Sequence, residues 1–141
     1  MMMRGSLAQG LYDAGIRWRP QNGDWFCLDT NDVDPWLVAP GAIELGMHDG
    51  ATVLMFHGAS EWAMDAVHAV DATWLPSESQ VRQLLLEHAG AGVVVQLESR
   101  HEGVRCRLQL EDWLYESSAE QAVDAYASVL LAVLERAREQ S

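Results

Sequence analysis

Four residues in the middle of the chain have side chains of the kinds that bind transition metals. They are His57, Glu61, Asp65 and His68, at successive spacings of four, four and three residues. On a continuous α-helix these spacings place all four side chains on one face. Imidazole and carboxylate groups together are typical ligands of zinc, iron or manganese. The pattern predicts a metal site and, with it, a small metal-dependent enzyme or one that acts on a small molecule.

The same residues also fit a solvated helix face that binds nothing. Gly58 and Ser60 indicate that a helix begins only after His57, with Ser60 as its N-cap. The apolar side chains of Trp62 and Ala66 would then face the protein. In this alternative His57 ends the preceding strand, and the acids lie in solvent.

Motifs for other enzyme chemistry are absent from the sequence. It contains no G-x-S-x-G, no glycine-rich phosphate loop, no H-E-x-x-H and no C-x-x-C. Cys27 and Cys106 lie in apolar strand patterns, which favour inert buried thiols. We therefore expect no cofactor, and the sequence favours a non-enzymatic protein over an enzyme.

The basic side chains with the clearest pattern are those of Arg105 and Arg107. They alternate with Val104, Cys106 and Leu108, so they occupy the solvent-facing side of a half-buried strand. There they are candidates to bind an acidic partner or a carboxylate ligand. The alternative is cross-strand pairing with Glu98 or with the acids of residues 111–116.

Six tryptophans are many for a chain of 141 residues. Most should be buried, but aromatic residues are also enriched where proteins bind partners. Trp25, Trp36 and Trp113 fall in short strands or beside acidic loops. We expect these three to be partly exposed and to contribute to a binding surface.

The second half of the sequence predicts a helix, three antiparallel strands and a second helix. Ser77 and Gln80 form a capping box at the start of the first helix. The strands are expected at 93–99, 104–110 and 112–116. A second capping box, Ser117 with Glu120, would start the last helix, 118–138, which has a long apolar stripe.

The first half predicts shorter elements. The expected order is a helix, a hairpin, a strand, a second hairpin around Asp49-Gly50 and a helix: 6–15, 16–19 with 24–29, 36–39, 42–48 with 52–57, and 61–70. This half has too little helix to cover its own strands. We therefore expect residues 1–141 to form a single α+β domain, in which amphipathic helices cover an antiparallel sheet.

The charge and the absence of targeting signals narrow the range of partners. Nine arginines, no lysine and 21 acids give a net charge of −12, which disfavours nucleic acid and anionic lipid as ligands. No apolar run reaches the ~20 residues of a membrane span, and the first residues do not form a signal peptide. The expected location is the cytoplasm, and the preference for arginine over lysine suggests a GC-rich bacterial genome.

Three sequence blocks resemble one known family. They are DAGIRWRPQNGDWF (13–26), FHGASEWAMDAV (56–67) and ATWLPSESQVRQLL (72–85). Their order and spacing are similar to those of a family of small uncharacterised bacterial proteins, mainly actinobacterial, with an FNGTTEWALDSV-like block and a WLP-like core. His57 stands where the family has Asn, and Ala59-Ser60 where it has a Thr pair. Members are sometimes labelled as pilus-assembly proteins; the resemblance implies no established activity and assigns no catalytic residue.

Together these observations favour a non-enzymatic interaction module. It would bind a protein partner, or self-associate as a homodimer, through an aromatic-rimmed surface. The metal-dependent enzyme around His57, Glu61, Asp65 and His68 is one alternative. The other is an acidic immunity- or inhibitor-like protein that meets a basic partner by charge steering.

Overall fold

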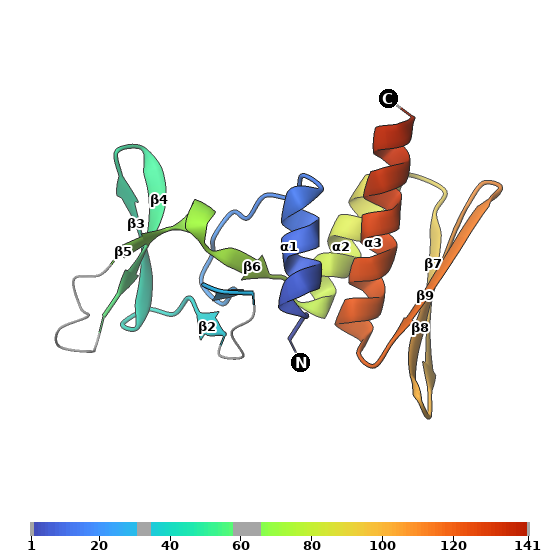
Figure 1. Cartoon of the computed structure of the whole chain (residues 1–141), viewed down its shortest axis with the longest axis horizontal. Coiled ribbons are helices and arrows are strands. Elements are labelled where there is room, and N and C mark those ends of the chain that lie inside the picture. Colours follow the sequence, from blue (N-terminus) through green and yellow to red (C-terminus); the bar gives the residue numbers. More distant parts are fainter. Residues whose placement is uncertain (1, 31–34, 58–65, 141) are drawn as a thin grey trace.

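The protein places a layer of three helices between β-sheets at its two ends (Figure 1). This computed structural model describes residues 2–30, 35–57 and 66–140. The described chain contains three antiparallel sheets of three strands each, so the predicted α+β class is confirmed. Helix α1 spans Gly5–Asp13, α2 spans Glu78–Ala89 and α3 spans Ala122–Glu139. None of the described helices is long and apolar enough to cross a membrane.

The C-terminal half has the predicted order of helix, three strands and helix. Strands β7 (Val94–Arg100), β8 (Gly103–Leu110) and β9 (Trp113–Ala119) form a sheet with β8 in the centre. The alternation in β8 is confirmed, because Cys106 and Leu108 are fully buried while Arg107 is exposed. The predicted capping box of α2 is also present.

The start of α3 differs from its prediction. Ser117 lies inside β9 and pairs with Cys106, so the predicted capping box with Glu120 does not form. The helix instead begins after Gln121, whose side chain makes no cap hydrogen bond. Local capping preference is outweighed here by the ladder that β9 completes along β8.

The N-terminal half forms two small sheets. In one, β1 (Trp25–Cys27) lies between β2 (Trp36–Leu37) and β6 (Thr73–Leu75). In the other, β4 (Ala51–Phe56) lies between β3 (Ile43–His48) and β5 (Ala66–His68). The predicted β3–β4 hairpin is confirmed, and Asp49 and Gly50 have the positive φ angles, 52° and 80°, that a tight hairpin turn requires.

Two predicted elements of this half are wrong. Residues 16–19 form no strand, and β1 pairs with β2 and β6 instead. The helix predicted over 61–70 fails in its described part, since Ala66–His68 is strand β5 and Ala69–Asp71 is one turn of 3₁₀ helix, η1. Pairing of β5 with β4 outweighs the helical preference of an alanine-rich stretch. Residues 61–65 lie outside the described residues.

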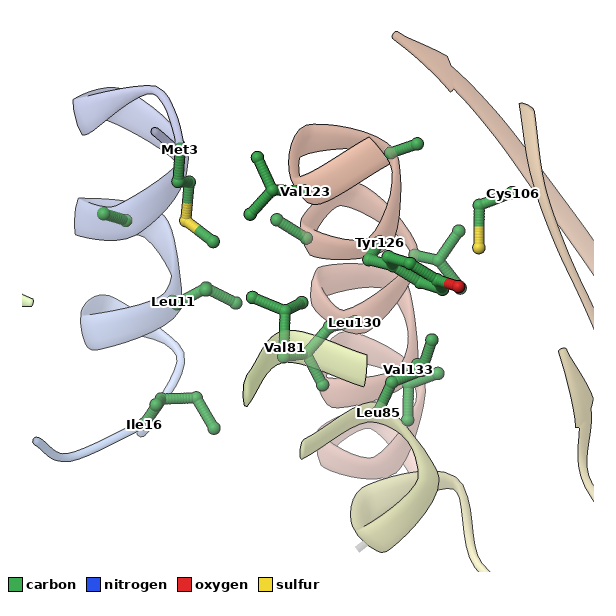
Figure 2. Close-up of a cluster of buried hydrophobic side chains, with 14 of the residues drawn as sticks. Met3, Leu11, Ile16, Val81, Leu85, Cys106, Val123, Tyr126, Leu130 and Val133 are labelled. Atoms are coloured by element: carbon green, nitrogen blue, oxygen red, sulfur yellow. The ribbon is translucent and has the colours of Figure 1, made fainter. Parts of the chain in front are cut away.

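Helix α3 is the centre of the larger core. Five consecutive residues, 123–127, are buried, which is more than one full turn and means that α3 is covered on all sides there. Figure 2 shows Val123 facing Met3, two residues before α1, whereas Tyr126 points toward Cys106 of β8. The N-terminus is held to the same helix, because the Arg4 backbone N–H donates a 3.0 Å hydrogen bond to buried Asp124.

A second, smaller core lies among the N-terminal sheets. Its buried members are Phe26, Val38, Ile43, Leu54 and Ala72. Strand β1 connects the two cores, because the side chain of Phe26 belongs to the smaller cluster and that of Cys27 to the larger one. This is the alternation of a strand that separates two apolar layers.

Candidate binding groove

The structure does not bring the two described histidines of the predicted metal site together. His57 follows the end of β4, and its Nε2 lies 3.6 Å from a Glu44 carboxylate oxygen. His68 pairs with Val53, about 13 Å along the strand from His57, and its ring lies 6.3 Å from that of His48. Glu61 and Asp65 lie outside the described residues. Within the ranges that are described, no three His, Cys, Asp or Glu side chains are grouped as a metal site would need.

Arg105 and Arg107 lie on the solvent-facing side of the C-terminal sheet, where the alternation predicts them. The Glu116 carboxylate lies 3.0 Å from Arg107 Nε and 3.9 Å from Arg105 Nη1. Arg100, on the same face, forms an ion pair with Glu98. The cross-strand pairing considered as the alternative is therefore present, and it compensates much of the positive charge offered to a ligand.

The three tryptophans predicted to bind do not form one surface. Trp25 is partly buried against the larger core. Trp36 is 40 % exposed and stands edge-on to the Phe56 ring, with ring centroids 5.3 Å apart. Trp113 begins β9, on the other side of the helix layer (Figure 1). Of these three tryptophans, Trp113 lines a groove within the described part of the chain.

This groove lies between β9 and α3 and is called here the α3–β9 groove. It has a volume of about 560 Å³. The residues that line it are Trp113, Tyr115, Ser128, Leu131, Ala132, Glu135, Arg136 and Glu139. On the helix they follow spacings of three and four, as one face of an α-helix requires.

Two aromatic rings form the strand side of the groove. Trp113 and Tyr115 are two residues apart, so they lie on the same face of β9, with ring centroids 6.0 Å apart. The Arg136 guanidinium carbon lies 4.6 Å from the Trp113 ring centroid, a cation–π distance. This contact holds the indole at one end of the groove and fixes its orientation.

The helix side changes in character along its length. Leu131 and Ala132 are partly buried and present apolar surface, whereas Glu135 and Glu139 are exposed acids one to two turns further on. Only two residues connect β9 to α3, so the helix runs back along the strand and its C-terminal end, which carries Glu135, Arg136 and Glu139 at the groove, lies near Trp113. Because the Arg136 guanidinium lies over the indole, the other charged groups that line this end of the groove are the carboxylates of Glu135 and Glu139. Such a groove suits a ligand with both apolar and basic groups.

Strand β9 also has a free side. In the sheet it pairs with β8, and within the described chain no strand lies along its other side. An edge strand presents a row of backbone N–H and C=O groups that can pair with another chain. The groove therefore combines side-chain pockets with available backbone hydrogen-bonding groups.

A second groove of about 560 Å³ lies beside α2 and contains the other unexpected feature, buried Asp24. One carboxylate oxygen accepts from Trp18 Nε1 at 2.9 Å and from the Gln21 backbone N–H at 3.1 Å. The other oxygen accepts from Gln80 Nε2 at 2.9 Å. Because both oxygens have donors within the chain, we assign Asp24 a structural role rather than a ligand-binding one.

Comparison with protein-family models, with curated proteins and with solved structures finds no match to this chain. The family resemblance described above therefore stays a prediction. Sequence reasoning selected Trp113, which lines the groove, but not Tyr115, Leu131, Glu135 or Glu139. The signal for the three helix residues is the spacing of three and four along 128–139, a stripe separate from the buried one; for Tyr115 it is the spacing of two from Trp113 along the strand.

Proposed function

We propose that this chain is a non-enzymatic, cytoplasmic binding module of a bacterial cell. In this proposal its docking site for a protein partner is the α3–β9 groove. The observation that carries the proposal is the placement of an aromatic pair, an apolar helix face and two exposed acids around one open groove. Aromatic residues in such positions are enriched among those that dominate binding energy.

The charge of the chain supports a partner with a basic contact surface. A protein of net charge −12 attracts basic proteins at long range, and the residues that line the groove include two acids, Glu135 and Glu139, against one base, Arg136. The immunity- or inhibitor-like alternative also involves a basic partner, so it is compatible with this proposal. The metal-dependent alternative has no comparable support in the described residues.

Site-specific photocrosslinking in cells of the native host tests the docking site. A photoreactive p-benzoylphenylalanine replaces Ala132 within the groove or, as control, Leu86, which is 39 % exposed on α2. We expect a crosslinked partner from position 132 and none from position 86. The partner is then purified and titrated against the wild-type chain.

The purified partner should bind the Trp113→Ala variant at least about tenfold more weakly. Trp36→Ala is the matched control, because Trp36 is also partly exposed but lies in the other half of the molecule. Equal crosslinking from both positions, or equal loss of affinity in both tryptophan variants, contradicts the assignment of the groove.

A further inference from the structure

The structure points to the way in which the partner binds. We infer that an extended segment of the partner adds to the free edge of β9 as a fourth strand of the C-terminal sheet, with basic side chains directed at Glu135 and Glu139 of α3. This inference rests on the function proposed above and specifies its binding mode and the chemistry of the partner.

The first argument is that β9 lacks the usual protection of an edge strand. Natural edges carry proline, basic residues or other charges that prevent pairing with a second chain. Strand β9 has seven residues, no proline and one charge, Glu116, which is engaged by Arg107 across the sheet. The opposite edge, β7, carries Glu98 and Arg100.

The second argument is geometric. An added strand would lie ~4.8 Å from β9, and every second side chain would point to the helix side of the sheet. On that side the α3–β9 groove is open beside Trp113 and Tyr115. On the opposite side Leu114, 45 % exposed, is available for an apolar cross-strand contact. Both faces of an added strand would therefore meet matching surface.

The third argument decides between a different partner and a second copy of this chain. Two copies would each carry −12, so long-range charge repulsion opposes the pairing of β9 with a second β9. A segment with arginine or lysine at alternate positions would instead neutralise Glu135 and Glu139. Charge complementarity therefore favours a basic strand from another protein.

Selection from a phage-displayed library of random twelve-residue peptides, with the full chain as target, provides the probe. We expect selected peptides to alternate basic residues with β-branched or aromatic ones. The tightest peptide is synthesised and added to the ¹⁵N-labelled chain, and amide hydrogen exchange is measured. Strand addition should slow the exchange of outward amides in β9 and leave the amides of β7 unchanged.

Charge variants test the predicted chemistry. Glu135→Arg with Glu139→Arg should weaken peptide binding at least about tenfold, whereas Glu87→Arg with Glu102→Arg, on other surfaces, should have much less effect despite the same change in net charge. Circular dichroism confirms that each variant is folded.

The outcomes are distinguishable. If the peptide shifts the NMR signals of groove residues but does not slow amide hydrogen exchange in β9, strand addition is wrong. The proposed docking site is then retained. Slow exchange in β9 without peptide, together with a dimeric mass by light scattering, assigns the edge to a second copy and overturns the choice of partner. Peptides that bind away from the groove, or no selected peptide at all, overturn both proposals.

Discussion

The side-chain amide of Gln80 donates a 2.9 Å hydrogen bond to Asp24, a residue 56 positions earlier in the chain. The same glutamine accepts a 2.9 Å hydrogen bond from the backbone N–H of Ser77, which completes the capping box of α2. Gln80 thus joins the start of a helix to a buried carboxylate in the N-terminal half. One side chain serves both local and long-range structure.

Replacement of Asp24 by alanine should destabilise the protein strongly. The carboxylate accepts from Trp18, Gln21 and Gln80, and its loss leaves these donors without their acceptor in a site that is 5 % exposed. We expect the free energy of unfolding to fall by about 2–4 kcal/mol. Urea unfolding measures the change, with exposed Asp112 replaced by alanine as control. Similar losses in the two variants contradict the structural role of Asp24.

Replacement of Gln80 by methionine should cost less than loss of Asp24 but more than a surface substitution. The variant keeps the size of the side chain and removes both the cap acceptor and the donor to Asp24. We expect a loss of about 1–2 kcal/mol. Gln83→Met is the matched control, since Gln83 lies on the same helix and bonds only to exposed Glu87 in the contacts described. The control should change stability by less than about 0.5 kcal/mol.

The two glycines of α1 should respond to alanine in opposite directions. A Cβ on Gly5 would overlap the carbonyl oxygen of Thr30, and this backbone contact should cost about 1–3 kcal/mol. A Cβ on Gly10 would meet only the Leu131 side chain, at 3.5 Å, so the gain in helix propensity should stabilise by about 0.5–1 kcal/mol. Thermal unfolding distinguishes the two: a Gly5→Ala variant as stable as the wild type contradicts the close approach at Gly5, and a destabilised Gly10→Ala variant contradicts the open space at Gly10.

The stability of the protein should fall between about pH 9 and pH 11. Burial raises the pKa of the Cys106 thiol from 9.0 to about 11, so in this range the unfolded chain loses a proton that the folded chain keeps. Below pH 9 the Cys106 thiol is protonated in both the folded and the unfolded chain, so it does not affect the free energy of unfolding. Above pH 9 the free energy of unfolding decreases by up to about 1.4 kcal/mol per pH unit. Tyr126 adds to the decrease, because burial and then the Cys106 charge raise its pKa.

The comparison that isolates Cys106 uses the variant Cys106→Val. Valine preserves an apolar side chain at this buried position of β8 and removes the titrating group. Unfolding free energies measured from pH 8 to pH 11 should therefore decline less steeply in the variant than in the wild type. Parallel curves for the two proteins show that Cys106 does not titrate differently in the folded state.

The ion pair between Arg107 and Glu116 should contribute little to stability. Both side chains are at least one-third exposed, although Arg107 Nε lies only 3.0 Å from the carboxylate. A double-mutant cycle with alanine at both positions should give an interaction energy of about 0.2–1 kcal/mol, smaller at high salt. A coupling of several kcal/mol, insensitive to salt, contradicts this assignment.

Local signals were sufficient to predict the order of helix and strands in the C-terminal half, although not the start of α3. The alternation of residues 104–110 and the Ser77–Gln80 capping box each lie within a few residues, and both appear in the structure. The N-terminal half depends on distant pairings, such as Phe26 with Trp74, that no local pattern reveals. Ala66–Val70 illustrates the consequence, because its composition favours helix whereas its position beside β4 makes it strand and 3₁₀ turn.

The candidate groove was predictable only in part. Trp113 could be selected because an aromatic residue followed an acidic turn, but its neighbours on α3 come from a helix that turns back along β9. The partners of Asp24 were not predictable at all, since Gln80 meets it through the packing of α2 on the loop before β1. Sequence distance conceals such contacts even when every element is assigned correctly.

The bond between Arg4 and Asp124 has a consequence for biosynthesis. It joins residues 120 positions apart, and the apolar face of α1 is buried against α3. While the ribosome makes the chain, Leu11 and its neighbours on α1 can pack against β6 but cannot complete their burial until α3 emerges. We therefore expect the helix layer to form late in synthesis, and α1 to be the segment on which a chaperone acts first.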